Sequence, residues 1–308
     1  MGQHFSLLDQ WFPPRPLWSV ADIPDLTGKV ALVTGGNAGI GRELVKQLLT
    51  RKATVYLAAR SENKATQAID DLETETGHRA RFIRLDLADI FAVRAAAADF
   101  LAKESELHLL FANGGVMWPA HSELTADGLD LQFGTNVAGH YALIKLLLPA
   151  LRAASSPDNK ARVVVTSSMA AYLATLRFGS FEAGETRDGM TTYDLYDQSK
   201  HGSVVLAKEL ARQYGDVLTI TSCNPGNLRT ELQRNVPQPL RWLLQYGLLY
   251  PVPYGALTPL YAGVATETAD ANGKFFVPWA RAGECRPEAS DPEMGKKLWA
   301  WLESATGV

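Results

Sequence analysis

The chain lacks the features that mark disulfide-rich, metal-binding and membrane-spanning proteins. It has two cysteines in 308 residues, Cys223 and Cys285, which excludes a disulfide framework and suits a reducing compartment. Its six histidines are scattered, and neither HExxH nor CxxC spacing occurs, so we expect no metal site. The best apolar run, residues 141–151, is too short to cross a bilayer and contains Lys145.

Strong charge, repeats and linkers are missing as well. A formal net charge of -3 does not mark a nucleic-acid-binding protein. Hydrophobic residues make up 46% and charged residues 20%, the balance of an ordinary soluble globular protein. We therefore expect a cytoplasmic protein with an N-terminal arm (1–28), one catalytic domain (29–278) and a C-terminal extension (279–308).

The N-terminus has no charged start and long apolar stretch, so it does not read as a signal peptide. Gly2 and Ser6 match the myristoylation pattern, but this short pattern often arises by chance, and the alternative is an unmodified arm. Aromatic residues and prolines between Trp11 and Trp18 indicate an extended segment that lies over the domain.

From Lys29 onward, strand-like and helix-like segments alternate, which is typical of a parallel α/β sheet. The predicted strands are short apolar runs at residues 30–34, 54–59, 80–85, 107–112, 162–167, 218–224 and 274–277. Helical patterns include residues 42–50, 62–76, 90–102 and 129–151. Right-handed crossovers then give one doubly wound Rossmann-type domain, a seven-stranded parallel sheet in the order 3-2-1-4-5-6-7. Asp291 and Pro292 predict the start of a last helix.

The first strand runs into a glycine-rich turn, residues 34–41. Gly35, Gly39 and Gly41 would let the backbone approach a pyrophosphate, and the helix N-terminus that includes Ile40 would supply free N–H groups. Asn37 could add a donor. An ordinary glycine-rich turn is the alternative, but its place after the first strand favours a dinucleotide site.

The second strand ends at Arg60, with no acid beside it. In dinucleotide-binding folds an acid here binds the ribose 2′-OH of NAD, whereas a base accommodates the 2′-phosphate of NADP. The sequence therefore predicts NADP(H), unless Arg60 is only a solvated surface residue. Asp86 follows the third strand, where its carboxylate could reach the adenine amino group or cap the next helix.

Three further segments could contact the nicotinamide end. Asn113 and two glycines follow the fourth strand and would leave room for the ring. Asn136 lies within a long helical pattern, where an inward-pointing polar side chain needs partners. The sixth strand leads into Pro225 and Gly226, whose turn could wrap the nicotinamide, with Thr230 close to its phosphate or amide.

Two Tyr–Lys pairs have the same four-residue spacing. Tyr196 and Lys200 come after Ser168, which ends the fifth strand at the side of the sheet that faces a ligand. Residues four apart share a helix face, and an ammonium near a phenol lowers the phenol pKa. Tyr141 and Lys145 precede that strand, so we interpret them as helix packing with a snorkelling lysine.

Taken together, these residues resemble the short-chain dehydrogenase/reductase family. The TGxxxGxG turn, the helical Asn, the Ser that ends strand five, YxxxK and the PGxxxT turn occur in order over residues 29–277. The residues 112–115 depart from the family's NNAG, which puts the local hydrogen bonding in doubt. The resemblance implies carbonyl–alcohol interconversion with NADP(H). It also implies a catalytic tetrad of Asn136, Ser168, Tyr196 and Lys200.

Finer features resemble one branch of that family. The segment 173–194 is similar to an insertion of retinol-dehydrogenase-like members, and the proline-rich arm looks like that of fungal ones. Family members often dimerise through the helices corresponding to 129–151 and 196–214, so a homodimer is a further expectation. A non-enzymatic NADP-binding module and a same-fold epimerase or dehydratase are the alternatives to this oxidoreductase.

Bulky residues after Thr230 predict a large apolar substrate. Leu240, Leu243, Leu244 and Leu248 share a helix face that could line the substrate pocket. Packing of this face on the core is the equal alternative. With the N-terminal aromatic residues, the same surface could instead rest on a membrane.

Overall fold

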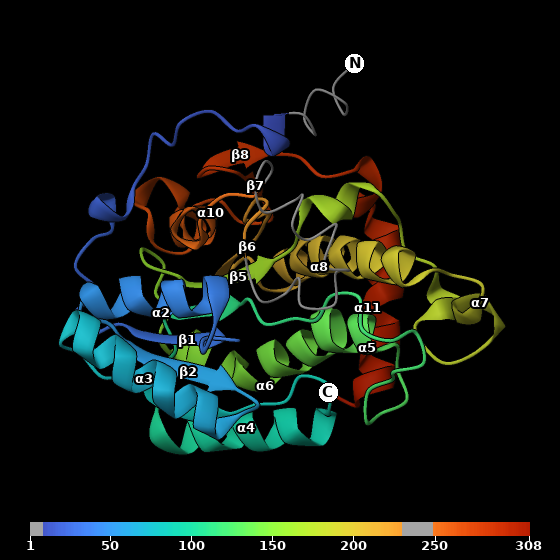
Figure 1. The fold of residues 1–308 in the computed structure, drawn as a ribbon, viewed down its shortest axis with the longest axis horizontal. Helices are drawn as coiled ribbons and strands as arrows, with labels where there is room; N and C mark the ends of the chain where they lie inside the picture. Colours follow the sequence, from blue (N-terminus) through green and yellow to red (C-terminus); the bar gives the residue numbers. More distant parts are fainter. Residues whose placement is uncertain (1–8, 230–248) are drawn as a thin grey trace.

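The computed structural model describes residues 9–229 and 249–308, and its centre is a sheet of eight strands (Figure 1). The strand order is β3-β2-β1-β4-β5-β6-β7-β8. The strands are β1 (Val30–Thr34), β2 (Thr54–Ala59), β3 (Arg81–Arg84), β4 (Leu109–Ala112), β5 (Ala161–Thr166), β6 (Leu218–Cys223), β7 (Phe275–Val277) and β8 (Arg281–Gly283).

The predicted doubly wound sheet is confirmed, with one addition. The first seven strands are parallel and follow the predicted order. The eighth, β8, pairs antiparallel with β7, and Phe275 lies opposite Gly283. β8 could not be predicted, because it is three residues long and half-exposed or exposed, without the apolar run of a buried strand.

Helices cover both faces of the sheet. α2 (Gly39–Thr50), α3 (Glu62–Thr76) and α10 (Val252–Val264) pack over one face. α4 (Ile90–Lys103), α6 (Gly139–Ala153) and α8 (Thr192–Tyr214) pack over the other. Successive strand residues such as Leu32 and Val33 belong to opposite cores, because side chains alternate along a strand. This explains why the strands read as continuous apolar runs.

Side-chain caps fix where several helices begin. Ser61 accepts a hydrogen bond from the Lys64 N–H at the start of α3. Asp89 caps α4, and Thr191 with Asp194 forms a capping box at the start of α8. Such caps satisfy N–H groups that have no partner within the helix.

The predicted continuous helix over 129–151 is interrupted. It consists of α5 (Leu131–Phe133), a π-helical turn (Gly134–Ala138) and α6. All five residues of the π turn are buried, and Asn136 is one of them. Periodicity could not reveal this turn, because one widened turn leaves the apolar pattern on both sides intact.

Residues 9–28 of the N-terminal arm pack on the domain, as expected. The Trp18 ring is buried and meets Tyr261 edge-on at 5.6 Å. Asn224 donates to the Gln10 side chain at 2.8 Å, and Asp9 forms an ion pair with Arg281 at 2.8 Å. The division of the chain into arm, domain and extension stays a prediction.

The last helix, α11 (Pro292–Thr306), begins at the predicted cap, Asp291. Its buried residues include Leu298 and Leu302, and it packs on α8 and α6 (Figure 1). Trp299 meets Tyr141 of α6 edge-on at a centroid distance of 5.1 Å. The C-terminal extension therefore covers the helical layer on one face of the sheet.

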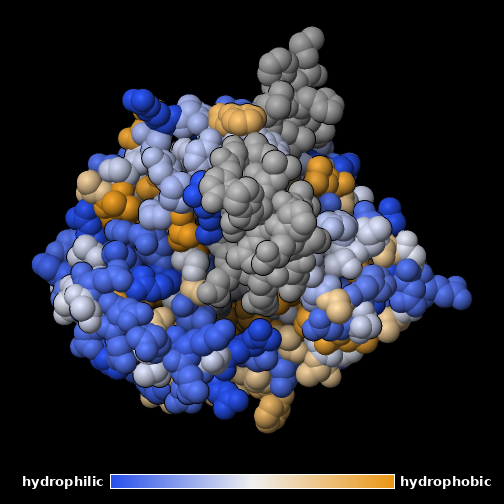
Figure 2. All heavy atoms as spheres, in the orientation of Figure 1, coloured by the Kyte–Doolittle hydropathy of each residue, from blue (hydrophilic) through white to orange (hydrophobic). Residues whose placement is uncertain are grey.

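Figure 2, in the same orientation, shows mostly hydrophilic side chains over α3 and α4. Among the described residues, no helix is long and apolar enough to span a membrane. The same residues contain no group of three or more His, Cys, Asp or Glu side chains placed to hold a metal ion.

Candidate active site

A groove of about 300 Å³ opens at the carboxyl ends of β1, β2 and β4. It is lined by the glycine-rich turn, by the end of β2 and by the residues that follow β3 and β4. The predicted cofactor residues that line it are Gly35, Asn37, Gly39, Ile40, Gly41, Arg60, Asp86 and Asn113. Ligands of doubly wound sheets bind at this edge.

The glycine-rich turn has a shape that other residues would not permit. Gly35 and Gly39 have left-handed backbones, with φ of +66° and +54°. A Cβ on Gly35 would lie 2.9 Å from Gly114 Cα, and one on Gly41 would overlap the Gly35 carbonyl. The start of α2 has no side-chain cap at Ala38. The residues present thus fit a dinucleotide pyrophosphate, since the backbone can approach it and helix N–H groups remain to bind it.

A basic cluster lies at the end of β2. Arg60 and Ser61 are exposed and line the groove together with Lys64, in the first turn of α3. Lys64 was missed in the sequence. It could have been predicted from its position, because a residue in the first turn of the helix that follows Arg60 lies close to the same strand end.

Asp86 does not cap the helix after β3. Its Oδ1 accepts a hydrogen bond from the Ala88 N–H at 3.0 Å, whereas Asp89 caps α4. The alternative interpretation of Asp86 as a helix cap is therefore wrong. Its carboxylate lies at the wall of the groove.

The Thr34 hydroxyl ties the end of β1 to the segment after β4. It accepts hydrogen bonds from the N–H groups of Asn113 (2.9 Å) and Gly114 (2.8 Å). The Asn113 side chain donates in return to the Thr34 carbonyl at 3.1 Å. These bonds hold the segment that departs from NNAG against the end of β1.

The four predicted catalytic residues converge next to this groove. Tyr196 and Lys200 are buried on α8, and Lys200 Nζ lies 5.8 Å from the centroid of the Tyr196 ring. Burial raises the pKa of Tyr196, and a hydrogen bond with the hydroxyl of Ser168, which follows β5, offsets part of this rise. Lys200 Nζ donates to the Thr166 carbonyl at 3.3 Å, and burial lowers the pKa of Lys200 to about 8.

Asn136 is held in place by its own side-chain hydrogen bonds. Its Oδ1 accepts from the Val116 N–H at 2.9 Å, and its Nδ2 donates to the Ser199 hydroxyl at 2.9 Å. A Cβ on Gly115 would come within 2.7 Å of Asn136 Oδ1 and 3.7 Å of Lys200 Nζ. The two polar groups thus flank Gly115, a residue that lines the groove.

The Tyr141–Lys145 pair lies elsewhere. The Tyr141 side chain is fully buried, and Lys145 Nζ lies 4.9 Å from the centroid of the Trp299 ring on α11. The prediction that this pair serves helix packing is confirmed.

The turn after β6, which contains Pro225, places Gly226 beside Trp279. Gly226 has φ of +91°, and a Cβ there would lie 2.7 Å from the Trp279 ring. Its N–H donates to Asn224 Oδ1 at 2.9 Å. Thr230 and the predicted pocket-lining residues Leu240, Leu243, Leu244 and Leu248 lie outside the described residues.

Comparison with known proteins decides the family. The short chain dehydrogenase family model matches residues 29–241. The chain belongs to the short-chain dehydrogenase/reductase family. It is thus an oxidoreductase of a family that binds a nicotinamide cofactor and acts on small molecules.

Relatives of this dehydrogenase/reductase include fungal and mammalian members. A short-chain dehydrogenase/reductase of Armillaria gallica is 55% identical over 305 residues, which cover 99% of this chain and 98% of that one. Mouse polyprenol dehydrogenase is 36% identical, covering 93% and 86% of the two chains. Mouse retinol dehydrogenase 11 is 38% identical, covering 82% and 78%. The retinol-dehydrogenase-like branch is therefore confirmed.

A solved structure of the family is also similar. The RhlG/NADP active-site complex of Pseudomonas aeruginosa has a TM-score of 0.65 and 27% sequence identity, covering 82% of this chain and 95% of that chain.

An aromatic cluster that the sequence did not reveal lies beside Tyr196 in this dehydrogenase/reductase. The Trp118 ring meets Tyr196 edge-on at 6.4 Å and Tyr193 at 4.5 Å. Trp118 has a left-handed backbone, with φ of +51°, an uncommon and costly conformation for a bulky residue. The backbone N–H of Trp118 donates to Gln132 Oε1 at 3.0 Å, and Gln132 Nε2 donates to the Thr192 carbonyl at 2.9 Å.

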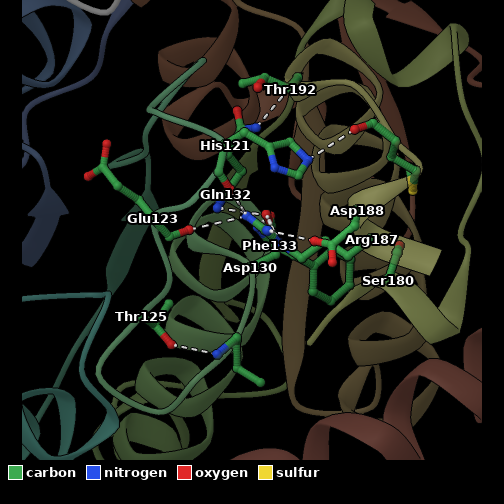
Figure 3. A network of polar contacts seen from close by, with 12 residues as sticks. His121, Glu123, Thr125, Asp130, Gln132, Phe133, Ser180, Arg187, Asp188 and Thr192 are labelled. Atoms are coloured by element: carbon green, nitrogen blue, oxygen red, sulfur yellow. Dashed lines mark hydrogen bonds and ion pairs between the residues drawn. The ribbon is translucent and has the colours of Figure 1, made fainter. Parts of the chain in front are cut away.

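A buried ion pair supports this cluster (Figure 3). Arg187, from the insertion, donates through Nε to Asp130 Oδ2 at 3.1 Å, and both side chains are almost fully buried. Its Nη2 donates to the carbonyls of both His121 and Glu123. Asp130 Oδ1 also accepts N–H groups at the start of α5. The insertion is thereby fastened to the loop after β4 and to the helix that leads to Asn136.

Proposed function

We propose that this chain is an NADP(H)-dependent oxidoreductase that interconverts a carbonyl, either an aldehyde or a ketone, and an alcohol. It would act as a carbonyl reductase or an alcohol dehydrogenase, with Tyr196 as the acid/base. The observation that carries the proposal is the meeting of Tyr196, Lys200 and Ser168 in a buried site beside the dinucleotide groove.

Each polar group of the site has a separate task in the reduction direction. Bound cofactor supplies the hydride. The Ser168 hydroxyl hydrogen-bonds the substrate oxygen and holds it in place. Tyr196 donates its phenolic proton to that oxygen, and the Lys200 ammonium favours the resulting phenolate. Asn136 would hold a water that links Lys200 to solvent for reprotonation. Alcohol oxidation runs through the reverse steps.

Three side chains at the end of β2 support NADP(H) over NAD(H). Arg60 and Lys64 offer two cations, and Ser61 a hydroxyl, to a 2′-phosphate on the adenosine ribose. Ala59 and Ser61 flank Arg60, so no neighbouring carboxylate would repel that phosphate. The similar Pseudomonas aeruginosa structure is described as an NADP complex.

Two observations support a bulky apolar substrate. Relatives over most of the chain carry the names polyprenol dehydrogenase and retinol dehydrogenase 11, and both name large apolar alcohols. The rings of Trp118 and Tyr193 provide apolar surface next to Tyr196. Such surface beside a few polar groups is typical of small-molecule sites.

The decisive variant is Tyr196→Phe, which removes the hydroxyl and keeps the ring. We expect turnover with NADPH to fall at least a hundredfold, since general acid–base groups contribute roughly 10²–10⁴-fold, while the Kd for NADPH stays near that of the unmodified protein. Tyr141→Phe is the matched control, since Tyr141 packs against α11, and should change turnover little. Near-native kcat in Tyr196→Phe would overturn the assignment.

A substrate panel separates the finer alternatives. Long-chain and isoprenoid aldehydes should give higher kcat/KM than short polar ketones, and the opposite ranking would reject the apolar site. Tight NADPH binding without turnover of any carbonyl would indicate a binding module. A substrate that changes stereochemistry without net cofactor change would indicate an epimerase. Peripheral membrane contact and a homodimer remain predictions, tested by liposome flotation and sedimentation velocity.

A further inference from the structure

His140 joins the cofactor groove to the π turn. It lies on α6, and its side chain is fully buried, with 2% of the residue exposed. Its Nε2 lies 2.9 Å from the Thr34 hydroxyl, and its Nδ1 lies 3.0 Å from the Asn136 carbonyl oxygen. One imidazole thus spans from the end of β1 to the backbone of a proposed catalytic residue.

These contacts fix which nitrogen of His140 carries the proton. A carbonyl oxygen can only accept, so Nδ1 must be the donor to Asn136. Burial and the nearby Lys200 charge lower the pKa of His140 to about 4, so the ring is neutral at physiological pH. Nε2 therefore has a free lone pair and accepts, which obliges the Thr34 hydroxyl to donate to it.

The direction of the remaining bonds follows from Thr34. With its proton directed to His140, its lone pairs accept the N–H groups of Asn113 and Gly114. The competing acceptor, the Phe111 carbonyl, is farther away at 3.4 Å. An unbroken chain of hydrogen bonds therefore runs from the segment after β4, through Thr34 and His140, to the Asn136 carbonyl. The chain joins the segment after β4 to the backbone of Asn136, so it holds the two ends of the site in one relative position.

We infer that His140 is a positioning residue that sets the Asn136 backbone in the π turn and, through Thr34, the Asn113–Gly114 wall of the cofactor groove. The inference rests on the proposed function for the roles of Asn136 and the groove. The hydrogen-bond direction itself does not depend on any activity.

The first test is the tautomer of His140 in the cofactor-free protein. We expect ¹⁵N NMR of the histidine rings to show a protonated Nδ1 and an unprotonated Nε2, unchanged from pH 5.5 to 8.5. The His140 signal is assigned by its absence from a His140→Asn sample. A protonated Nε2, or titration near pH 6.5, would overturn the inference whether or not the enzyme turns over.

The second test separates the two ends of the imidazole. His140→Asn places an amide where Nδ1 lies and keeps a donor for Asn136, whereas His140→Gln places one where Nε2 lies and keeps the Thr34 contact. We expect His140→Asn to raise the Kd for NADPH about threefold to tenfold with little change in kcat, and His140→Gln to lower kcat by a similar factor at near-normal Kd. Thr34→Val should raise the Kd at least as much as His140→Asn, since it also removes the acceptor of the Asn113 and Gly114 N–H groups, and Thr34→Ser should restore the Kd.

His201 provides the matched control. It is a second fully buried histidine whose Nδ1 contacts a backbone carbonyl, that of Ala171, at 3.1 Å. His201→Asn should lower Tm without separating Kd from kcat. If both His140 variants changed Kd and kcat together, in proportion to their loss of Tm, His140 would only pack the core. Retained turnover in Tyr196→Phe would instead reject the proposed function and leave the tautomer unaffected.

Discussion

In the proposed NADP(H) site, Arg60 and Lys64 make cofactor choice sensitive to single substitutions. A charge-assisted hydrogen bond to a 2′-phosphate contributes roughly 1.5–3 kcal/mol, about tenfold to a hundredfold in affinity. We expect Arg60→Ala and Lys64→Ala each to raise the KM for NADPH by such a factor and to leave the KM for NADH nearly unchanged. Arg60→Asp should reverse the preference.

The control is Arg79→Ala, because Arg79 is exposed and pairs with Asp70 and Glu73 of α3. It should leave both KM values unchanged. Equal kcat/KM for NADPH and NADH in the unmodified enzyme would show that the basic cluster is only surface charge.

Sequence motifs predicted single residues only where one residue type is required. Gly35 was predicted from the need of a tight turn for glycine, and Arg60 was predicted to lie at the groove because it ends the second strand. Trp118 and His140 could not be predicted, because their roles come from contacts with residues distant in the chain, such as Tyr196 and Thr34. A buried histidine in a helix reads as core, and no local pattern shows which oxygen its ring nitrogens meet.

At the scale of secondary-structure elements, two carboxylates on α8 should affect stability in opposite directions. Burial, aided by the charge of Asp194, raises the pKa of Asp197 to about 7. Folded protein then keeps this proton up to about pH 7, whereas the unfolded chain loses it near pH 4. Ionised Asp197 therefore destabilises the fold increasingly from pH 4 to 7. Asp197→Asn should raise Tm more at pH 8 than at pH 5, as measured by thermal unfolding.

Asp194 provides the contrast on the same helix. Hydrogen bonds from Thr191 lower its pKa below the ordinary value, so its carboxylate stabilises the fold above about pH 4. Asp194→Asn should lower stability by about 1 kcal/mol at both pH 5 and pH 8, as expected for a weakened capping box. An Asp197→Asn effect independent of pH would contradict the assigned burial.

The insertion depends on the Arg187–Asp130 pair. Arg187→Met would leave a buried carboxylate without its partner, which costs about 3–5 kcal/mol. Asp130→Asn combined with Arg187→Met should recover part of this loss, and urea unfolding of the double-mutant cycle measures the coupling. Asp188→Asn is the control, because its exposed carboxylate lies 3.9 Å from Arg187 and should contribute under about 0.5 kcal/mol. Strictly additive losses would contradict the pair's role.

Sequence periodicity predicted elements well where burial repeats over many residues. The helix over 62–76 has the same bounds as α3, since its buried residues recur every three to four positions. The π turn around Asn136 and the short strand β8 were missed, because neither is long enough to produce a repeat. The position of the site at the strand ends was thus predicted, whereas the π turn that positions Asn136 was not.

At the scale of the whole molecule, α11 covers part of the helices through which a dimer is predicted. Trp299 contacts Tyr141 of α6 and Tyr214 of α8, and Trp301 contacts Phe133. A dimer of the intact chain must use surfaces of α6 and α8 that α11 leaves open. We expect a chain ending at Ser290 to self-associate more strongly than the intact chain in sedimentation velocity. Equal association of both would show that α11 does not protect these helices.

The two edge strands affect the tendency of this protein to aggregate at high concentration. At one edge, β3 is four residues long and begins and ends with the exposed residues Arg81 and Arg84. At the other, β8 is three residues long and begins with Arg281. A foreign strand that extended the sheet would meet few backbone partners and charged side chains at either edge, and such edges resist aggregation. Concentrated solutions of the folded chain should therefore stay clear. Fibres should form only under conditions that unfold the sheet.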